Sequence, residues 1–279
     1  MSLPLALGAL AAPRTYKLTT TSHMRMNEAE ERNVYHTVAR QTLLERKPNN
    51  TYRLAVEILS FETENPTFFT ALAADLNQVS NRLIIHTDIY GRLETIENKA
   101  EMVQTWQRIR PEVVKKYQQY YPKAFFDAFG QNIQVEGVFE KTLRHKGLHG
   151  VLLPGLYGYG YAPDAPISGR RVLEQFINQV ELPLLTTTTA RPAEPTADVL
   201  HLDLAGQLNE AAFRDDELRR LFRTMADNPL LKVDLTATCT ESYQLEASSG
   251  WLRSAEQRLK VEVPGIYHNE MHHQLETVS

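Results

Sequence analysis

Apolar and polar residues alternate with a period of two along several long segments of this sequence, which is the pattern of half-buried β-strands. The first segment runs from Tyr16 to Met26. Polar residues at 27–32 predict a turn, and Pro48-Asn49-Asn50 is a strong turn signal. Further strands are predicted at about 33–46 and 52–61, so the first part of the chain reads as an antiparallel meander.

The same alternation returns in the second half of the sequence. Apolar residues occupy mainly odd positions from Val233 to Leu245, and turns at 248–250 and 264–265 separate this strand from two more, at 251–263 and 266–278. Earlier strands are predicted at 171–178, 180–189 and 199–204. Prolines and four successive threonines between Pro183 and Ala197 predict a long loop there.

Helical spacing of apolar residues predicts helices at 67–79, from Asn98 onward, within 123–145 and at 209–227. Asn98 with Glu101 three residues later forms a capping-box pattern, and Pro111 predicts a kink or a restart of that helix. Trp106 lies on its apolar stripe, so we expect this indole to be buried between the helix and the first sheet. A hairpin is predicted at 83–96, and the segment 147–169 reads as irregular.

These elements predict an α+β fold of curved antiparallel β-sheets, with helices packed on one face, in two similar halves. The halves would be residues 15–150 and 151–279, after an apolar N-terminal segment 1–14, or they would form one continuous domain. The shared order of elements suggests an internal duplication. The alternative is that meanders with one helix resemble one another by default.

The N-terminal segment allows two interpretations. Leu3–Ala12 has the length of a signal-peptide apolar region, and Ala9-Leu10-Ala11 fits a small-x-small cleavage site. No basic residue precedes the stretch, which favours the other interpretation, an apolar arm of a cytoplasmic protein. An export signal predicts a mature protein that begins near Ala12 or Pro13.

Composition narrows the classes of function. Of the 279 residues, 42% are hydrophobic and 23% are charged, which is typical of globular proteins and excludes a largely disordered chain. The net charge of −4 argues against general binding to nucleic acid. No apolar run is long enough for a transmembrane helix. The single cysteine excludes an internal disulfide and a thiolate metal cage.

No catalytic signature occurs in the sequence: it contains no nucleophile elbow, P-loop, dinucleotide fingerprint or zinc-protease helix. The segment from Gly155 to Tyr161 is rich in glycine and tyrosine. Tyr157, Tyr159 and Tyr161 are our candidate ligand- or partner-binding residues, because tyrosine offers rigid, amphipathic contact area. The alternative is a loop whose tyrosines cover the core of the protein.

His268, Glu270 and His272 would point to one face of the last strand, where two imidazoles and a carboxylate are potential zinc ligands. We expect this face to be exposed and expect no functional metal site, because the sequence offers no obvious fourth ligand. No cofactor is predicted.

Other reactive residues are assigned structural roles. Cys239 has inward parity and is expected to be a buried, inert thiol. His201 and Asp203 have outward parity and lack a nucleophile nearby in sequence. Basic residues on the helix after Asn98 and at the start of the next one are interleaved with tyrosines, and we interpret them as a solvated helix face rather than a nucleic-acid patch. They are Arg108, Arg110, Lys115, Lys116 and Lys123.

Several short motifs resemble a loosely defined group of uncharacterised β-rich bacterial proteins. The motifs are Leu83–Asp88, Gly91-Arg92-Leu93, Ile96-Glu97-Asn98, Trp106 and Leu153–Gly158. Some members of that group are associated with contractile-injection or type VI-like secretion loci. The resemblance implies an accessory or structural role. The C-terminal meander with its Gly-Trp turn is also similar, at the level of fold, to envelope carrier proteins whose sheet curls around an apolar ligand.

The sequence therefore predicts a non-enzymatic binding or structural component of a larger bacterial assembly that acts on protein partners through its surfaces. One alternative is a carrier of an apolar ligand held between sheet and helices. Another is a metal-dependent hydrolase that uses the C-terminal histidines.

Overall fold

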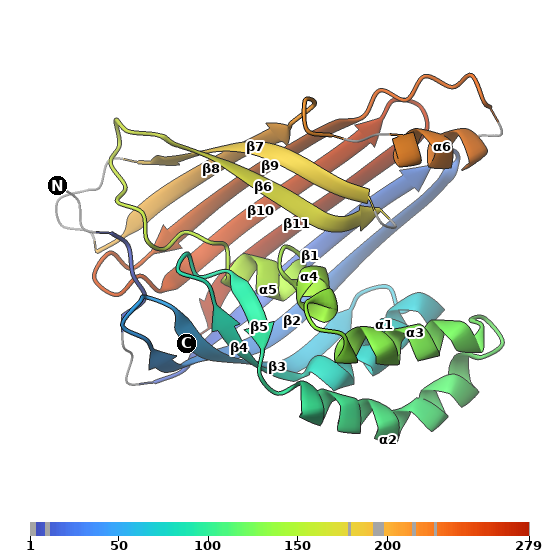
Figure 1. The fold of residues 1–279 in the computed structure, drawn as a ribbon, viewed down its shortest axis with the longest axis horizontal. Coiled ribbons are helices and arrows are strands. Elements are labelled where there is room, and N and C mark those ends of the chain that lie inside the picture. The colour runs from blue at the N-terminus through green and yellow to red at the C-terminus, as the bar shows by residue number, and fades with distance from the viewer. Residues whose placement is uncertain are drawn as a thin grey trace. The chain divides into compact units, whose positions relative to one another are not determined.

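A computed structural model describes residues 4–8, 12–177, 180–191, 198–213, 216–225 and 228–278 (Figure 1). The strands are β1 (Arg14–Met26), β2 (Ala29–Arg46), β3 (Tyr52–Thr63), β4 (Arg82–Thr87), β5 (Leu93–Ile96), β6 (Ile167–Ile177), β7 (Val180–Ala190), β8 (Leu200–Leu208), β9 (Thr236–Leu245), β10 (Leu252–Val263) and β11 (Tyr267–Val278). The helices are α1 (Phe68–Asn77), a 3₁₀ turn η1 (Gln78–Ser80), α2 (Lys99–Tyr117), α3 (Lys123–Gln134), α4 (Val138–Leu143), α5 (Gly147–Leu152) and α6 (Asp216–Met225).

The described strands form one antiparallel sheet of 11 strands in the order β5-β4-β3-β2-β1-β11-β10-β9-β8-β7-β6. Together with the six α-helices of the described residues, this sheet confirms the predicted α+β class with antiparallel strands. The finer expectations, two similar halves and helices on one face, stay predictions, as does the division at residue 150. None of the described helices has both the length and the apolar character needed to span a bilayer.

Contacts divide the chain into two compact units. The C-terminal unit contains the described residues of 1–8, 19–34 and 159–276, and the N-terminal unit contains those of 9–18, 35–158 and 277–279. Strands β1 and β2 are each divided between the two units. Residues 19–34, which include the turn between these strands, belong to the C-terminal unit, and the remaining residues of both strands belong to the N-terminal unit.

Several elements lie at positions that differ from those that local turn signals predict. The polar segment 27–32 is largely strand, because the turn between β1 and β2 needs only Asn27 and Glu28, and Asn27 adopts a left-handed backbone (φ 52°). Pro183 and the four threonines lie inside β7 rather than in a loop, while residues 192–197 lie outside the described residues. Part of the segment 147–169 is helical, as α5. Helix α6 begins at Asp216 rather than at 209.

The core of the C-terminal unit lies between its sheet and α6. Helix α6 turns Leu218 and Phe222 toward apolar residues of strands β6–β11, and both side chains are about 1% exposed. The remaining buried members of this core are Leu173, Val180, Leu182, Leu184, Leu204, Val233, Ala237, Cys239, Val261, Val263 and Tyr267. The helix thus covers one end of the strands, where Figure 1 shows it beside β6 and β7.

An N-terminal arm, Pro4–Gly8, packs onto the turn between β9 and β10. The amide of Gly8 donates to Ser249 O at 2.7 Å, and the indole of Trp251 donates to Gly8 O at 3.0 Å. Leu7 is only 1% exposed. The proposed cleavage site Ala9-Leu10-Ala11 lies outside the described residues, so the choice between arm and export signal stays open.

The N-terminal unit is built around α2, which continues through Pro111 without a restart. Trp106 is buried, as predicted, at 4% exposure. Its indole packs against α3, edge-on to Phe129 at 4.9 Å and directly over Gly130. These contacts join α2 to α3, and the expected contact of the indole with the first sheet stays a prediction.

Asn98 is the N-cap residue of α2, but its side chain makes no capping bond to the helix backbone. Its Oδ1 accepts from Ile84 N at 2.9 Å, and its Nδ2 donates to Arg82 O and to Glu101. The predicted capping box is therefore wrong. The side chain instead connects the start of α2 to strand β4.

Candidate functional site

The three candidate tyrosines do not form one exposed contact surface. Tyr157 is 6% exposed, packs edge-on against Tyr52 at 5.4 Å and lies over Gly91 in the N-terminal unit. Tyr159 and Tyr161 belong to the C-terminal unit, are half-buried and have ring centroids 6.2 Å apart. Only the latter two present part of their rings to solvent.

The candidate metal ligands on β11 are half-buried and paired across the sheet. Arg258 donates to Glu270 Oε1 at 2.6 Å, and Glu256 Oε1 lies 2.7 Å from His272 Nε2. His268 Nε2 lies 3.6 Å from the other oxygen of Glu270. These side chains form a row of polar contacts along β11 and across to β10. In the described part of the chain, no three His, Cys, Asp or Glu side chains are grouped so that they could hold a metal ion.

On the inner face of the C-terminal unit, a polar cluster interrupts the apolar lining. The register places Glu241, Gln257 and His273 directly opposite one another on β9, β10 and β11. Glu241 and His273 are 6% and 7% exposed. We call the following residues the inner polar cluster: Arg171, Cys239, Glu241, Tyr243, Gln257 and His273.

The carboxylate of Glu241 is the centre of this cluster. It accepts a two-pronged interaction from the guanidinium of Arg171, a hydrogen bond from Tyr243 Oη at 2.5 Å and one from Cys239 Sγ at 3.2 Å. Gln257 Nε2 in turn donates to Tyr243 Oη at 2.8 Å. The donors of the protein itself therefore satisfy the hydrogen-bonding capacity of this buried carboxylate and compensate its charge.

The electrostatics of the cluster agree with this structural role. Burial alone would raise the pKa of Glu241, but the charge of Arg171 and the hydrogen bonds outweigh it, so the carboxyl keeps a pKa below its usual value. Burial, and then the Glu241 charge, raise the pKa of the Cys239 thiol and of Tyr243. Cys239 is therefore held as a neutral thiol, which is not a nucleophile at neutral pH.

His273 is the member of the inner polar cluster that lies on β11. Its Nδ1 is hydrogen-bonded to Thr20 Oγ1 at 2.8 Å, and burial lowers its pKa to about 4. Sequence reasoning missed Glu241, although its odd position between Cys239 and Tyr243 marked it as inward-facing. Nothing local pointed to its partner Arg171, which is 70 residues away in the sequence.

An aromatic cluster lies at the surface of the N-terminal unit, where α1 begins and α2 passes into α3. The ring of Phe68 contacts Tyr120 at 3.8 Å and Tyr121 at 6.0 Å, and Tyr121 stacks on Phe125 at 4.8 Å. Tyr120 is 59% exposed, and Phe125 is 37% exposed. Phe69, the next residue of α1, is 58% exposed. We call Phe68, Tyr120, Tyr121 and Phe125 the aromatic cluster.

The backbone and the core hold this cluster in place. Tyr120 N and Tyr121 N both donate to Tyr117 O, at 3.0 and 3.1 Å. Beneath them, Tyr117 is 1% exposed, packs edge-on against Phe68 at 4.9 Å and donates its hydroxyl to Asp75 at 2.7 Å. The exposed rings are therefore held in position by backbone hydrogen bonds and by the buried Tyr117.

Basic residues around α2 divide into paired and unpaired groups. Lys116 pairs with Asp75 at 2.8 Å, and Arg110 pairs with Asp127 at 2.5 Å. Arg108, Lys115 and Lys123 are exposed, and no carboxylate of the described residues pairs with them. The predicted outward pair on β8 is also engaged: Asp203 binds Arg191 through both oxygens, and His201 is half-buried.

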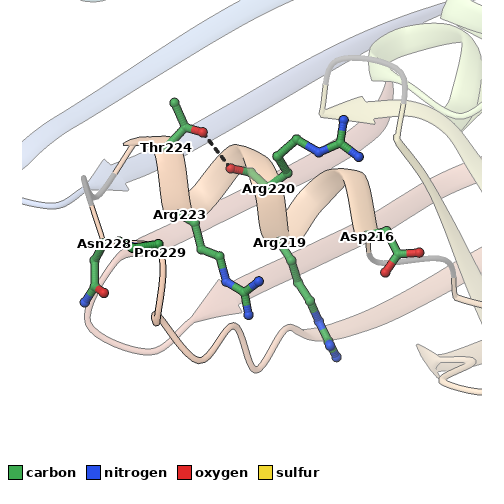
Figure 2. Close-up of a pocket in the computed structure, with 7 residues that line it drawn as sticks. All are labelled: Asp216, Arg219, Arg220, Arg223, Thr224, Asn228 and Pro229. Atoms are coloured by element: carbon green, nitrogen blue, oxygen red, sulfur yellow. Dashed lines mark hydrogen bonds between the residues drawn. The ribbon is translucent and has the colours of Figure 1, made fainter.

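A pocket of about 870 Å³ lies beside α6 (Figure 2). Its lining consists of Asp216, Arg219, Arg220, Arg223, Thr224, Asn228 and Pro229. Three of these seven side chains are guanidinium groups and one is a carboxylate, so the lining is positively charged.

A comparison of the sequence with protein-family models and with curated proteins finds no match in either. The site geometry alone therefore carries the functional argument.

Proposed function

We propose that the protein is a non-enzymatic binding component of a larger bacterial assembly, and that it binds a protein partner through the aromatic cluster of its N-terminal unit. The observation that carries this proposal is the exposure of Tyr120 and Phe125 on a rigid base. Exposed aromatic rings that are already ordered lose little side-chain entropy on binding, and aromatic residues dominate the energetics of protein interfaces.

The charge around the cluster defines the chemistry of the partner. Lys115 and Lys123 are exposed near the two ends of the α2–α3 turn and lack a carboxylate partner among the described residues. A complementary segment would carry apolar side chains for the rings and acidic residues for the lysines. We therefore expect a protein surface in which apolar and acidic residues alternate.

The test is a pull-down from the native host followed by affinity measurement with the purified partner. Tyr120→Ser/Phe125→Ser should raise the Kd by about thirty-fold or more, the effect of losing a hot spot of about 2 kcal/mol. Ile89→Ser/Val135→Ser is the matched control, because these residues are 48% and 52% exposed but lie outside the cluster. Equal affinities for the cluster variant and the wild type would contradict the proposal, as would an equal loss in the control.

The alternative functions, an apolar-ligand carrier and a metal-dependent hydrolase, stay predictions. Mass spectrometry of ligands that copurify with the native protein tests the first. Zinc calorimetry on protein without a histidine tag, with His268→Ala as the comparison, tests the second.

A further inference from the structure

Helix α6 has two chemically distinct sides. Leu218 and Phe222 are buried in the core of the C-terminal unit, whereas Arg219 and Arg220 are exposed and Arg223 is half-buried at the pocket. Figure 2 shows Arg219 and Arg223, one helical turn apart, extending from the same side of the helix, and Arg220 extending from another. The three arginines thus lie on the part of α6 that is not buried in the core.

Two of these arginines, Arg220 and Arg223, carry charge that the described part of the chain does not neutralise. Arg223 Nε donates to the carbonyl of Leu231 at 3.1 Å, which fixes the side chain without neutralising it. In the described part of the chain, no carboxylate forms an ion pair with Arg220 or Arg223. A bound anion would compensate the charge of Arg220 and Arg223.

The donors at the pocket suit a phosphate group. Guanidinium groups present paired N–H donors that match phosphate oxygens, and such charge-assisted hydrogen bonds are short and strong. Asn228 Oδ1 accepts from Leu230 N at 3.1 Å, which leaves the Nδ2 group of this amide as a further donor. Thr224 donates its hydroxyl to Arg220 O at 2.9 Å and stabilises the last turn instead (Figure 2).

We propose that this arginine-lined pocket beside α6 binds the phosphate group of a phosphate ester. At about 870 Å³ the pocket has room for a moiety beyond the phosphate group. A soluble phosphorylated molecule and the headgroup of an anionic phospholipid share this chemistry. The site lies in the C-terminal unit and does not depend on the aromatic cluster.

Two probes distinguish the two sources of phosphate. Calorimetric titration with inorganic pyrophosphate represents the soluble ligand, and cosedimentation with phosphatidylcholine vesicles, with and without phosphatidylglycerol, represents the lipid. Saturable binding of pyrophosphate alone assigns a soluble ester. Binding that requires phosphatidylglycerol assigns a lipid headgroup, and binding of both probes supports the shared chemistry.

The variant Arg220→Ala/Arg223→Ala should weaken the observed binding at least ten-fold. Arg32→Ala/Arg258→Ala removes the same charge from exposed positions outside the pocket, 69% and 59% exposed, and should leave binding unchanged. Circular dichroism verifies the fold of both variants. The proposal is overturned if neither probe binds, or if both double variants weaken binding equally.

Discussion

The guanidinium of Arg171 on β6 meets the carboxylate of Glu241 on β9, although β7 and β8 lie between these strands in the sheet. In a flat sheet, strands three places apart would be separated by about 14 Å, and two side chains standing upright on the sheet would not meet. The contact therefore indicates that the sheet bends between β6 and β9 within the C-terminal unit.

We expect Glu241→Gln to lower the free energy of unfolding by about 3–5 kcal/mol, because it leaves the Arg171 charge buried without its counter-charge. The double variant Arg171→Met/Glu241→Leu should lose much less, since it removes both charges at once. Urea unfolding of the three proteins measures the difference. Asp203→Asn is the control, because the Asp203–Arg191 pair is more exposed and should contribute about 1 kcal/mol or less. A double variant less stable than Glu241→Gln would contradict this interpretation.

Stability should fall as pH decreases from 7 to 5. Burial lowers the pKa of His149 and of His273 to about 4, whereas an unfolded histidine titrates near 6.5. Between these values the unfolded chain binds a proton on each histidine that the folded chain does not bind, so acidification favours unfolding. Each histidine contributes a slope of up to about 1.4 kcal/mol per pH unit.

Urea unfolding at several pH values in this range measures the slope, which His149→Gln and His273→Gln should each reduce. His201→Gln serves as the control, because this side chain is only half-buried. An unchanged slope in both buried-histidine variants would show that other groups carry the pH dependence.

Packing between α2 and α3 should be sensitive to a single methyl group. A Cβ added at Gly130 would lie 2.5 Å from Nε1 of Trp106, so Gly130→Ala should lower the melting temperature although alanine favours helices by about 1 kcal/mol. Trp106→Ala should cost about 3–5 kcal/mol, as expected for a buried tryptophan. Thermal unfolding tests both variants, and an increase in Tm for Gly130→Ala would show that the two helices do not pack this closely.

The thiol of Cys239 should be unreactive in the folded protein. It is 5% exposed, and burial raises its pKa, so little thiolate forms at pH 8. Ellman's reagent should label it only in denaturant, at a rate that follows unfolding. Rapid labelling under native conditions would mean that the inner face of the C-terminal unit opens to solvent.

Local sequence patterns were sufficient for most strands and for the α+β class. The alternation from Val233 to Leu245 predicted the inward residues of β9, because a pleated strand turns every second side chain to the same face. Pro183 contributed to the prediction of a loop, but it lies within strand β7. The last β7–β8 strand pair is Leu184 with Leu208, and Asn209 N still donates to Pro183 O at 2.9 Å. Pro183 therefore lies at the end of this pairing, where the strand tolerates a residue without an N–H donor.

Only the tertiary structure decided which distant groups meet. Asn98 and Glu101 have the spacing of a capping box, but strand β4 offers Asn98 better partners in Ile84 N and Arg82 O. Periodicity likewise places Glu241 on the inner face, yet it does not indicate that Arg171 meets it from β6. The sequence by itself thus determined the inward and outward positions of regular strands such as β9, because this alternation depends on neighbours two residues away. Partners of buried polar groups and the members of surface clusters depended on contacts between remote segments, which periodicity does not encode.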